Sequence, residues 1–379
     1  MILSTARRAA MAVLGLALVP LAACAPASSA HGLKIVATTT QICDYVTQIA
    51  AASTDLSLDK TDASGKQSHV GPAPDSAALT MSLTCLLAPN ASAHEHEMTP
   101  AQTAALAEAD VMAVSGVDLE HFLDDAVASS GFHGRMVVTS GVLTAADVDK
   151  PGAPDPQAPY TIDRGNERVE VAPWPFPPEN AGEEPEFRFD PHVWTSPVHA
   201  RIQVGNLGAG LAAAAPDAAS SINAATASYL EDLGALDAWV VEAIETVPEG
   251  QRVLFTSHDA FGYFSADYGI RFIGAALTDF NDQQDATADH IASAVQAVKD
   301  SGAVALFAEN SNNSKSIEAI ARGAGVTPIV GDDALYGDSL GPEGSAGATY
   351  VGSIIHNVRT LTDAWGGTVP ALPERLAGQ

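Results

Sequence analysis

The sequence predicts an α/β protein of two lobes, each a parallel sheet flanked by helices, joined by one long linking helix. Three observations predict this fold. The chain of 379 residues is too long for one ordinary hydrophobic core. Short β-rich runs alternate with helical stretches in both halves of the chain, as in parallel sheets covered by helices. Between the two halves, residues 218–246 keep a helical apolar spacing, which gives a helix of roughly 40 Å.

The first 23 residues have the pattern of a signal peptide. A short basic region at residues 7–8 precedes an apolar run that is too short for a stable membrane span. The run ends in Leu-Ala-Ala-Cys at residues 21–24, which resembles a bacterial lipobox. That resemblance implies cleavage before Cys24 and lipidation of its sulfur, so that the protein is held at a membrane through lipid. Ordinary secretion, with Cys24 merely present, is the alternative.

The first lobe is assigned to residues 24–215. Its expected strands and helices follow one another along the chain. The strands are expected at residues 33–38, 79–88, 111–117 and 135–139. The helices are expected at residues 40–52, 99–110 and 118–129. Thr99 with Pro100, and Asp118, are residue types that begin helices, so each marks an expected helix start.

Two segments interrupt the first lobe, near residues 53–77 and 150–189. Both are rich in proline, glycine and acidic residues, and we interpret them as surface loops or insertions. Their aspartates lack the spacing and the central glycine of an EF-hand, so no calcium site is assigned to them.

The linking helix is assigned to residues 216–248 and the second lobe to residues 249–379. A helix at 200–214 precedes Pro216, and the long helix follows it. Gly302 and Gly325 stand where two helices of the second lobe would end. The strands of this lobe are expected at 252–256, 270–273, 303–308 and 326–330. The helices are expected at 261–268, 286–299, 315–324 and 350–365.

The net charge of the chain limits the kinds of partner that it can bind. The formal net charge of −28 argues against nucleic acid as a partner, because phosphate binding needs clustered Lys and Arg. The charge serves solubility, and an acidic surface also gathers cations.

If Cys24 is lipidated, two cysteines remain, Cys43 and Cys85. They form either a disulfide or two buried thiols, and both possibilities stay open because the sequence does not give their Cα separation.

Four polar residues stand at the ends of expected strands or just beyond them: His94, His192, His258 and Asp338. In open α/β sheets, ligands bind beyond the carboxyl ends of the strands. Three imidazoles and one carboxylate suit Zn²⁺, and four protein ligands fit transport better than hydrolysis because no coordination position is left open. Imidazole also binds Mn²⁺, Ni²⁺ and Cu²⁺, so the ligand types alone do not identify the metal.

The segments around these residues resemble the solute-binding lipoproteins of bacterial zinc and manganese ABC importers, the metal-binding cluster A-I family. Asp190-Pro191-His192-Val193-Trp194 is similar to the segment of the second metal ligand in that family. The remaining similar segments are residues 34–42, 94–100, 256–264, 308–318, 335–340 and 349–352. They occur in the family's order and cover most of residues 34–365, apart from the two insertions.

The resemblance implies a function as well as a fold. It implies that His94, His192, His258 and Asp338 bind one metal ion in a non-enzymatic protein. Such a protein is anchored to the outer face of the cell membrane and delivers the metal to the permease of an ABC importer. We expect a monomer. A Glu in place of His258 would favour Mn²⁺, so the third imidazole favours Zn²⁺.

The sequence departs from the family at the first ligand. Ser92-Ala93 stand where the family often has Asp-Pro, and His96 stands where an aromatic residue is usual. His96 is therefore a rival or auxiliary ligand, or an outer partner of the site. The loop before His192 is acidic and nearly free of histidine, unlike the His-rich loop of many zinc members.

Three alternatives remain. The same kind of protein could carry Mn²⁺ instead of Zn²⁺. A zinc hydrolase would need an open coordination position and a general base, for which Glu95, Glu97 and Asp259 are the nearby candidates. A surface adhesin built on the same scaffold is the third.

Overall fold

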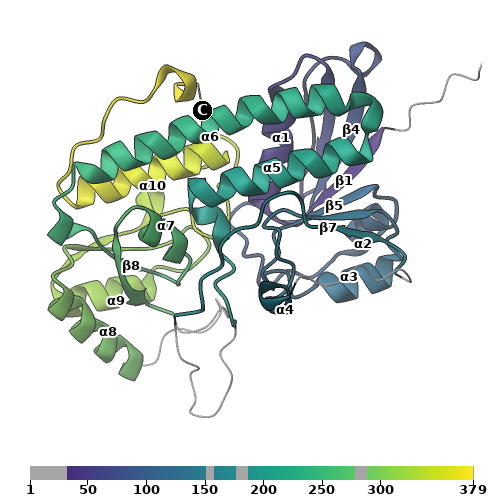
Figure 1. Cartoon of the computed structure of the whole chain (residues 1–379). Helices are drawn as coiled ribbons and strands as arrows, with labels where there is room; N and C mark the ends of the chain where they lie inside the picture. The colour runs from purple at the N-terminus through teal and green to yellow at the C-terminus, as the bar shows by residue number, and fades with distance from the viewer. Residues whose placement is uncertain (1–31, 151–157, 176–186, 278–287, 379) are drawn as a thin grey trace, which may run out of the picture. The chain divides into compact units, whose positions relative to one another are not determined.

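The computed structural model describes residues 32–150, 158–175, 187–277 and 288–378. It shows two sheets flanked by helices, with a long helix running across the top of both lobes in Figure 1. The expected α/β fold of two lobes is therefore confirmed. The expected signal peptide and Cys24 lie outside the described residues, as do parts of the segment 150–189.

The first sheet has seven strands in the order β3-β2-β4-β1-β5-β6-β7. All neighbouring strands are parallel except β2 and β3, which form an antiparallel pair. Apolar residues fill the central strands on both faces, as expected where helices cover a parallel sheet. The strands are β1 (Leu33–Ala37), β2 (Leu56–Thr61), β3 (Gln67–Val70), β4 (Leu79–Cys85), β5 (Val111–Val114), β6 (Arg135–Val138) and β7 (Thr161–Asp163).

The helices of the first lobe begin at capping residues that the sequence makes evident. The side chain of Thr39 accepts the amide of Ile42 at the start of α1, and Thr99 with Gln102 forms a capping box at the start of α2. These caps satisfy amides that have no partner within the helix. The helices are α1 (Thr40–Ala51), α2 (Pro100–Ala107), α3 (Leu123–Ser130) and α4 (Ala145–Asp149).

The second sheet has four parallel strands in the order β11-β10-β8-β9. Gly325 ends α9 in the left-handed conformation, as its place in the sequence suggested. The strands are β8 (Val253–Thr256), β9 (Arg271–Ala275), β10 (Ala305–Phe307) and β11 (Thr327–Ile329). The helices are α7 (Gly262–Asp267), α8 (Ala288–Ser301), α9 (Lys315–Ala324) and α10 (Tyr350–Ala364).

One long helix, α6 (Ala219–Glu245), joins the lobes, and α5 (Pro197–Ala214) of the first lobe precedes it. Ser196 caps α5, and α6 follows after a short 3₁₀ turn. One face of α6 buries residues at helical spacing, among them Ile222, Tyr229 and Trp239. This face packs on α1 in the first lobe and on α10 in the second. The 27 residues of α6 thus connect the hydrophobic cores of both lobes.

The structure differs from the sequence-based expectations in the first lobe. Residues 56–70 were expected to form a loop, but β2 and β3 extend the sheet as a hairpin. Leu56 and Leu58 of β2 are buried and lie opposite Leu79 and Met81 of β4, although turn residues and charges surround them. The third helix begins at Leu123 instead of residue 118, and Asp118 lies before it with a left-handed φ of 57°, outside the right-handed helical region.

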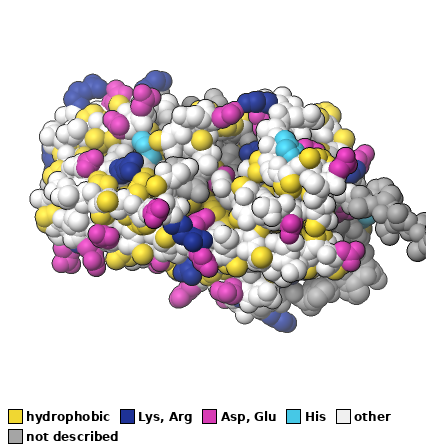
Figure 2. Space-filling model, turned by 90° about the horizontal axis from the view of Figure 1, so that it is seen from above, with side chains coloured by type: hydrophobic (Ala, Val, Ile, Leu, Met, Phe, Trp, Pro, Cys, Tyr) yellow, Lys and Arg dark blue, Asp and Glu magenta, His cyan; other side chains and the backbone are white. Residues whose placement is uncertain are grey.

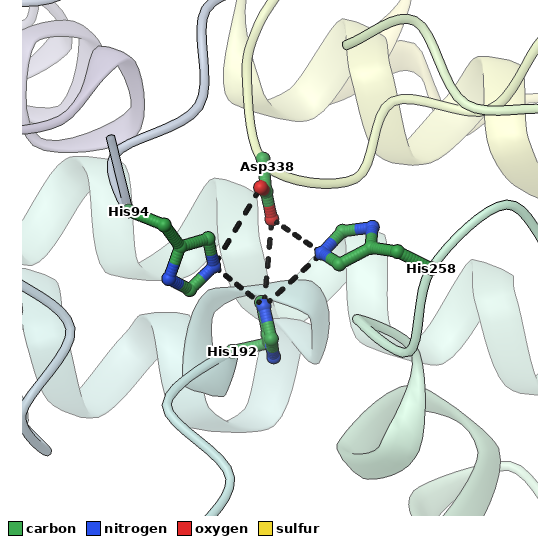
Figure 3. Close-up of side chains that lie close together, drawn as sticks. All are labelled: His94, His192, His258 and Asp338. Carbon is green, nitrogen blue, oxygen red and sulfur yellow. Dashed lines mark hydrogen bonds and ion pairs between the residues drawn. The ribbon is translucent and has the colours of Figure 1, made fainter. Parts of the chain in front are cut away.

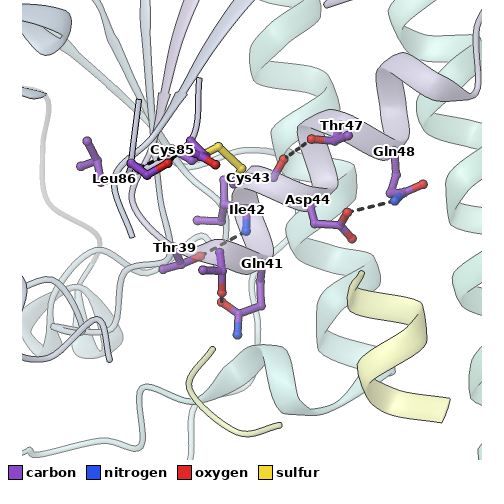
Figure 4. The surroundings of a disulfide bond; sticks show 12 residues. Thr39, Gln41, Ile42, Cys43, Asp44, Thr47, Gln48, Cys85 and Leu86 are labelled. Carbon is purple, nitrogen blue, oxygen red and sulfur yellow. Dashed lines mark hydrogen bonds between the residues drawn. A yellow bond between two sulfur atoms is a disulfide. The ribbon is translucent and has the colours of Figure 1, made fainter. Parts of the chain in front are cut away.

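Cys43 and Cys85 form a disulfide, which answers the question left open by the sequence. Their Cα atoms are 5.6 Å apart and the bond links the first turn of α1 to the last residue of β4 (Figure 4). Both side chains are buried. The disulfide therefore ties the start of a helix to the strand end from which the loop containing His94 departs.

Acidic side chains are spread over the face seen in Figure 2, with basic and apolar groups between them. This distribution agrees with a charge that serves solubility, because a single-sign patch is absent from that face. Among the helices in the described ranges, none is long and apolar enough to cross a membrane.

Candidate metal centre

Four segments that are distant in the sequence bring His94, His192, His258 and Asp338 together (Figure 3). His94 lies in the loop after β4, and His192 precedes a 3₁₀ turn at Val193–Thr195. His258 lies two residues beyond β8, and Asp338 lies in the loop between β11 and α10. One nitrogen or oxygen atom from each residue lies within 4.8 Å of the others, and all four residues are buried.

The three Nε2 atoms converge on the carboxylate of Asp338. Nε2 of His192 lies 3.1 Å from that of His94 and 3.3 Å from that of His258. Oδ1 of Asp338 lies 3.5 Å from Nε2 of His192 and 3.1 Å from Nε2 of His258. Oδ2 lies 3.6 Å from Nε2 of His94. The four groups thus surround one point, as the ligands of a metal ion do.

Two buried carboxylates orient two of the imidazoles. Asp190 Oδ1 accepts the backbone N–H of His192 at 2.9 Å and lies 2.8 Å from its Nδ1. Glu309 Oε1 accepts the backbone N–H of His258 at 2.9 Å, and Glu309 Oε2 lies 2.8 Å from Nδ1 of His258. Such outer carboxylates fix the tautomer and the ring orientation of metal-binding histidines.

A glycine lies against each outer carboxylate. A Cβ atom at Gly262 would lie 2.5 Å from Oδ2 of Asp190, and one at Gly337 would lie 2.1 Å from Oε2 of Glu309. Neither approach leaves room for a side chain. Both glycines therefore allow the carboxylates to reach the histidine rings.

The hydrogen bonds of the rings indicate that this arrangement suits a cation. In His192 and His258, Nδ1 faces a carboxylate oxygen, which only accepts hydrogen bonds when ionised. The neutral rings then carry the proton on Nδ1 and a lone pair on Nε2. When both rings are neutral, these lone pairs face each other across 3.3 Å, a repulsion that a proton on Nε2 of one ring or a metal ion bound by both rings removes. The residues present therefore fit a divalent metal ion.

The electrostatics of the site hold its carboxylate ionised. Burial raises the pKa of Asp338, but His258 and His94 outweigh burial and hold this pKa far below its usual range. Burial lowers the pKa of His258, but Asp338 and Glu309 outweigh it and raise this pKa well above its ordinary value. Burial dominates at His94 and lowers its pKa well below 6.5. Protons therefore compete for the site mainly at His258.

Hydrogen bonds from the first lobe hold the loop that carries Asp338. Gln41 Nε2 donates to the backbone oxygen of Asp338 at 3.0 Å, and Trp194 Nε1 donates to that of Gly337 at 2.9 Å. The backbone N–H of Leu340 donates to Thr40 Oγ1 at 2.9 Å. The second lobe thus contributes Asp338 from a loop that the first lobe fixes in place.

His96 lies outside the group of four. Its ring packs edge-on against Phe122, with centroids 4.9 Å apart, and its buried Nε2 has no hydrogen-bond partner among the described residues. The sequence reasoning assigned no role to Asp190, Glu309 or Ser92. The first two lie in the matching segments, and an acid two residues before His192 was a signal that could have identified Asp190.

The family described as "Zinc-uptake complex component A periplasmic", or ZnuA, matches residues 35–364 of the chain. The manganese-binding lipoprotein MntA of Bacillus subtilis is 30% identical over 285 residues, which cover 74% of this chain and 82% of MntA. The zinc-binding protein TroA of Treponema pallidum is 33% identical over 184 residues, covering 47% of this chain and 58% of TroA.

The fold is also that of a solved structure. The periplasmic zinc-binding protein TroA from Treponema pallidum superposes with a TM-score of 0.61 and 23% sequence identity. The superposition covers 88% of this chain and 99% of TroA. This likeness extends over both sheets and the long helix, so the arrangement of two lobes is that of TroA.

Proposed function

We propose that this chain, which belongs to the ZnuA family of solute-binding proteins of metal ABC importers, captures Zn²⁺ outside the cytoplasm and delivers it to an importer permease. Members of this family bind metal and are not enzymes, so the chain is a binding protein and the hydrolase alternative falls away. We further propose that it acts as a monomer and that residues 24–215, 216–248 and 249–379 are its two lobes and linking helix.

One observation carries the proposal: three imidazole nitrogens and one carboxylate oxygen lie buried within 4.8 Å of one another. We assign His94, His192, His258 and Asp338 as the metal ligands. Three nitrogens and one oxygen form a donor set that Zn²⁺ accepts in tetrahedral geometry. Because four protein ligands fill that geometry, no position remains for a reacting water, and the metal is cargo.

Manganese is the second candidate cargo, since MntA of Bacillus subtilis is named for manganese binding. Mn²⁺ prefers more oxygen ligands and a higher coordination number than this donor set offers. His258 provides a third nitrogen, which supports Zn²⁺ over Mn²⁺.

Competition between the two metals tests this proposal. Metal-stripped protein is titrated with Zn²⁺ and Mn²⁺ against a chelating indicator, in parallel with His192→Ala and Asp338→Ala. We expect one Zn²⁺ per chain, bound far more tightly than Mn²⁺, and at least about 100-fold weaker binding in each variant, since even outer partners contribute 10–100-fold. Preferred binding of Mn²⁺ would reverse the choice of cargo, and unchanged affinity in the variants would exclude the assigned ligands.

The proposed membrane anchor is at Cys24, which lies outside the described residues. Relatives named as lipoproteins, among them MntA of Bacillus subtilis, support the anchoring of this chain through lipid on Cys24. We expect the mature protein in the membrane fraction, with its N-terminus at an acylated Cys24. Release of the Cys24→Ala variant into the medium or periplasm would support the anchor, and equal membrane retention would contradict it.

A further inference from the structure

The carboxylate of Asp338 has a hydroxyl partner in the first lobe. Ser92 Oγ donates a hydrogen bond to Asp338 Oδ2 at 2.7 Å. The same Oγ accepts the backbone N–H of His94 at 3.3 Å. Since a hydroxyl has one proton and an ionised carboxylate only accepts, the proton of Ser92 points to Oδ2.

The two oxygens of Asp338 are therefore in different surroundings. Oδ1 faces the Nε2 atoms of His192 and His258, at 3.5 Å and 3.1 Å. Among the described residues, no hydroxyl or backbone amide is hydrogen-bonded to Oδ1. Oδ2 carries the hydrogen bond from Ser92 and lies farther from the nearest imidazole, at 3.6 Å from Nε2 of His94. The carboxylate thus turns toward the imidazoles of His192 and His258 the oxygen that Ser92 does not occupy.

Other hydrogen bonds hold the loop that contains Ser92 against the loop that contains Asp338. The backbone N–H of Asn90 donates to the backbone oxygen of Leu340 at 3.1 Å. Nδ2 of Asn310 donates to Oδ1 of Asn90 at 2.8 Å and to the backbone oxygen of Ser339 at 3.0 Å. These contacts fix the loop of Ser92 against the loop of Asp338 without the hydroxyl. Removing that hydroxyl should therefore change the carboxylate more than the loop positions.

We propose that Ser92 is a positioning residue that makes Asp338 a one-oxygen ligand through Oδ1 and thereby favours Zn²⁺ over Mn²⁺. The inference rests on the proposed function, because it requires a metal at the four residues. A carboxylate oxygen engaged in a charge-assisted hydrogen bond has less electron density for a metal. One oxygen and three nitrogens complete a tetrahedral site, whereas a second oxygen raises the coordination number toward what Mn²⁺ prefers.

Cobalt is the probe for this coordination, because four-coordinate Co²⁺ absorbs visible light more strongly than five- or six-coordinate Co²⁺. Native protein, Ser92→Ala and Ser92→Thr are loaded with Co²⁺, and the ratio of Zn²⁺ to Mn²⁺ affinity is measured for each. Ser345→Ala is the matched control, since its hydroxyl bonds to the backbone oxygen of Pro342 on the same loop as Asp338. Ser92→Gly removes the same hydroxyl and replaces Ser92→Ala if that variant does not fold.

We expect an intense four-coordinate spectrum for native protein, for Ser92→Thr and for the control. Ser92→Ala should absorb more weakly, and its Zn²⁺ to Mn²⁺ affinity ratio should fall about tenfold, as for the loss of an outer partner. A Ser92→Ala variant with the native spectrum and ratio would overturn the role of Ser92. So would a native protein that binds Co²⁺ at one per chain with a weak spectrum. Either of these results overturns the role of Ser92 and leaves the proposed function unchanged. Native protein that binds no metal would overturn the proposed function as well as the role of Ser92.

Discussion

At the residue scale, the ring orientation of two histidines depends on carboxylates that are not among the four residues of the candidate site. Glu309 holds both the backbone and the ring of His258, and Gly337 lets Glu309 approach because it has no Cβ. The contact of Nδ1 with Glu309 orients the ring of His258 so that its Nε2 points to the centre of the four residues. The affinity for metal should therefore respond to substitutions at residues outside the four proposed ligands.

The substitution Gly337→Ala tests this dependence. Its Cβ would lie 2.1 Å from Oε2 of Glu309, so the carboxylate must move away from His258. We expect metal affinity about 10–100-fold lower, as for the loss of an outer partner. Isothermal titration with Zn²⁺ measures it, and Gly205→Ala is the control because a Cβ there meets nothing within 4 Å. Equal affinity in both variants would contradict the role of Glu309.

The pH dependence of metal affinity follows from the pKa of His258. This pKa is raised well above its ordinary value by Asp338 and Glu309, which outweigh the lowering by burial. The ring must lose its proton to bind metal, so affinity is full above the raised pKa and falls as the pH drops through it. We expect a fall of roughly tenfold per pH unit for one displaced proton. Titrations from pH 8.5 down to about 5.5 in steps measure it, and a flat profile would contradict the three-histidine site.

The sequence identified the four candidate ligands because each lies in a segment that resembles the family. It did not predict the hydrogen bond of Ser92 to Asp338 or that of His258 to Glu309. These pairs join residues 246 and 51 positions apart, and only the packing of the lobes reveals such distances. His96 was weighed as a rival or auxiliary ligand because it stands where the family usually has an aromatic residue, but its ring packs on Phe122.

At the element scale, the disulfide fixes the start of α1 against the end of β4. Cys43 and Cys85 are 42 residues apart, so the bond closes a long loop in the unfolded chain. Replacing both by alanine should lower the free energy of unfolding by about 2–4 kcal/mol. Urea denaturation measures this loss, and reduction of the native protein should give a similar shift. Coincident unfolding curves for the native protein and the double variant would contradict a stabilising role.

The two long helices allow a matched pair of glycine substitutions. Gly234 lies within α6, where a Cβ would meet nothing within 4 Å, so Gly234→Ala should raise the free energy of unfolding by about 0.5–1 kcal/mol. Gly208 lies within α5, and a Cβ there would lie 2.3 Å from Oγ1 of Thr226 on α6. Gly208→Ala should therefore cost about 1–3 kcal/mol. Thermal and urea unfolding measure both, and effects of the same sign would contradict the close packing of α5 on α6.

Elements were easiest to predict where their signals are local. The start of α9 at Lys315 and its end before Gly325 agree with the sequence, because a left-handed glycine stops the helix. The hairpin of β2 and β3 was missed, because it pairs with β4 through contacts that its own charged sequence does not indicate. Asp118 was wrongly assigned as a helix cap, because its sequence neighbours do not indicate its left-handed φ of 57° or the hydrogen bond of its backbone N–H to Leu143.

At the scale of the whole molecule, the metal centre joins the two lobes. His94 comes from the first lobe and His258 from the second, while α6 connects the cores of the two lobes. A stiff connector of this kind is consistent with small movements of loops rather than wide closure. If capture and release of metal involve the loop that carries Asp338, the hydrogen bonds that join this loop to Gln41, Trp194 and Thr40 must break.

The position of bound metal tests the central claim most directly. A crystal of zinc-loaded protein, measured at the zinc absorption edge, gives the metal position from anomalous scattering. We expect one zinc peak about 2.0–2.2 Å from Nε2 of His94, His192 and His258 and from Oδ1 of Asp338. A zinc peak at another place in the chain, with these four side chains uncoordinated, would contradict the account.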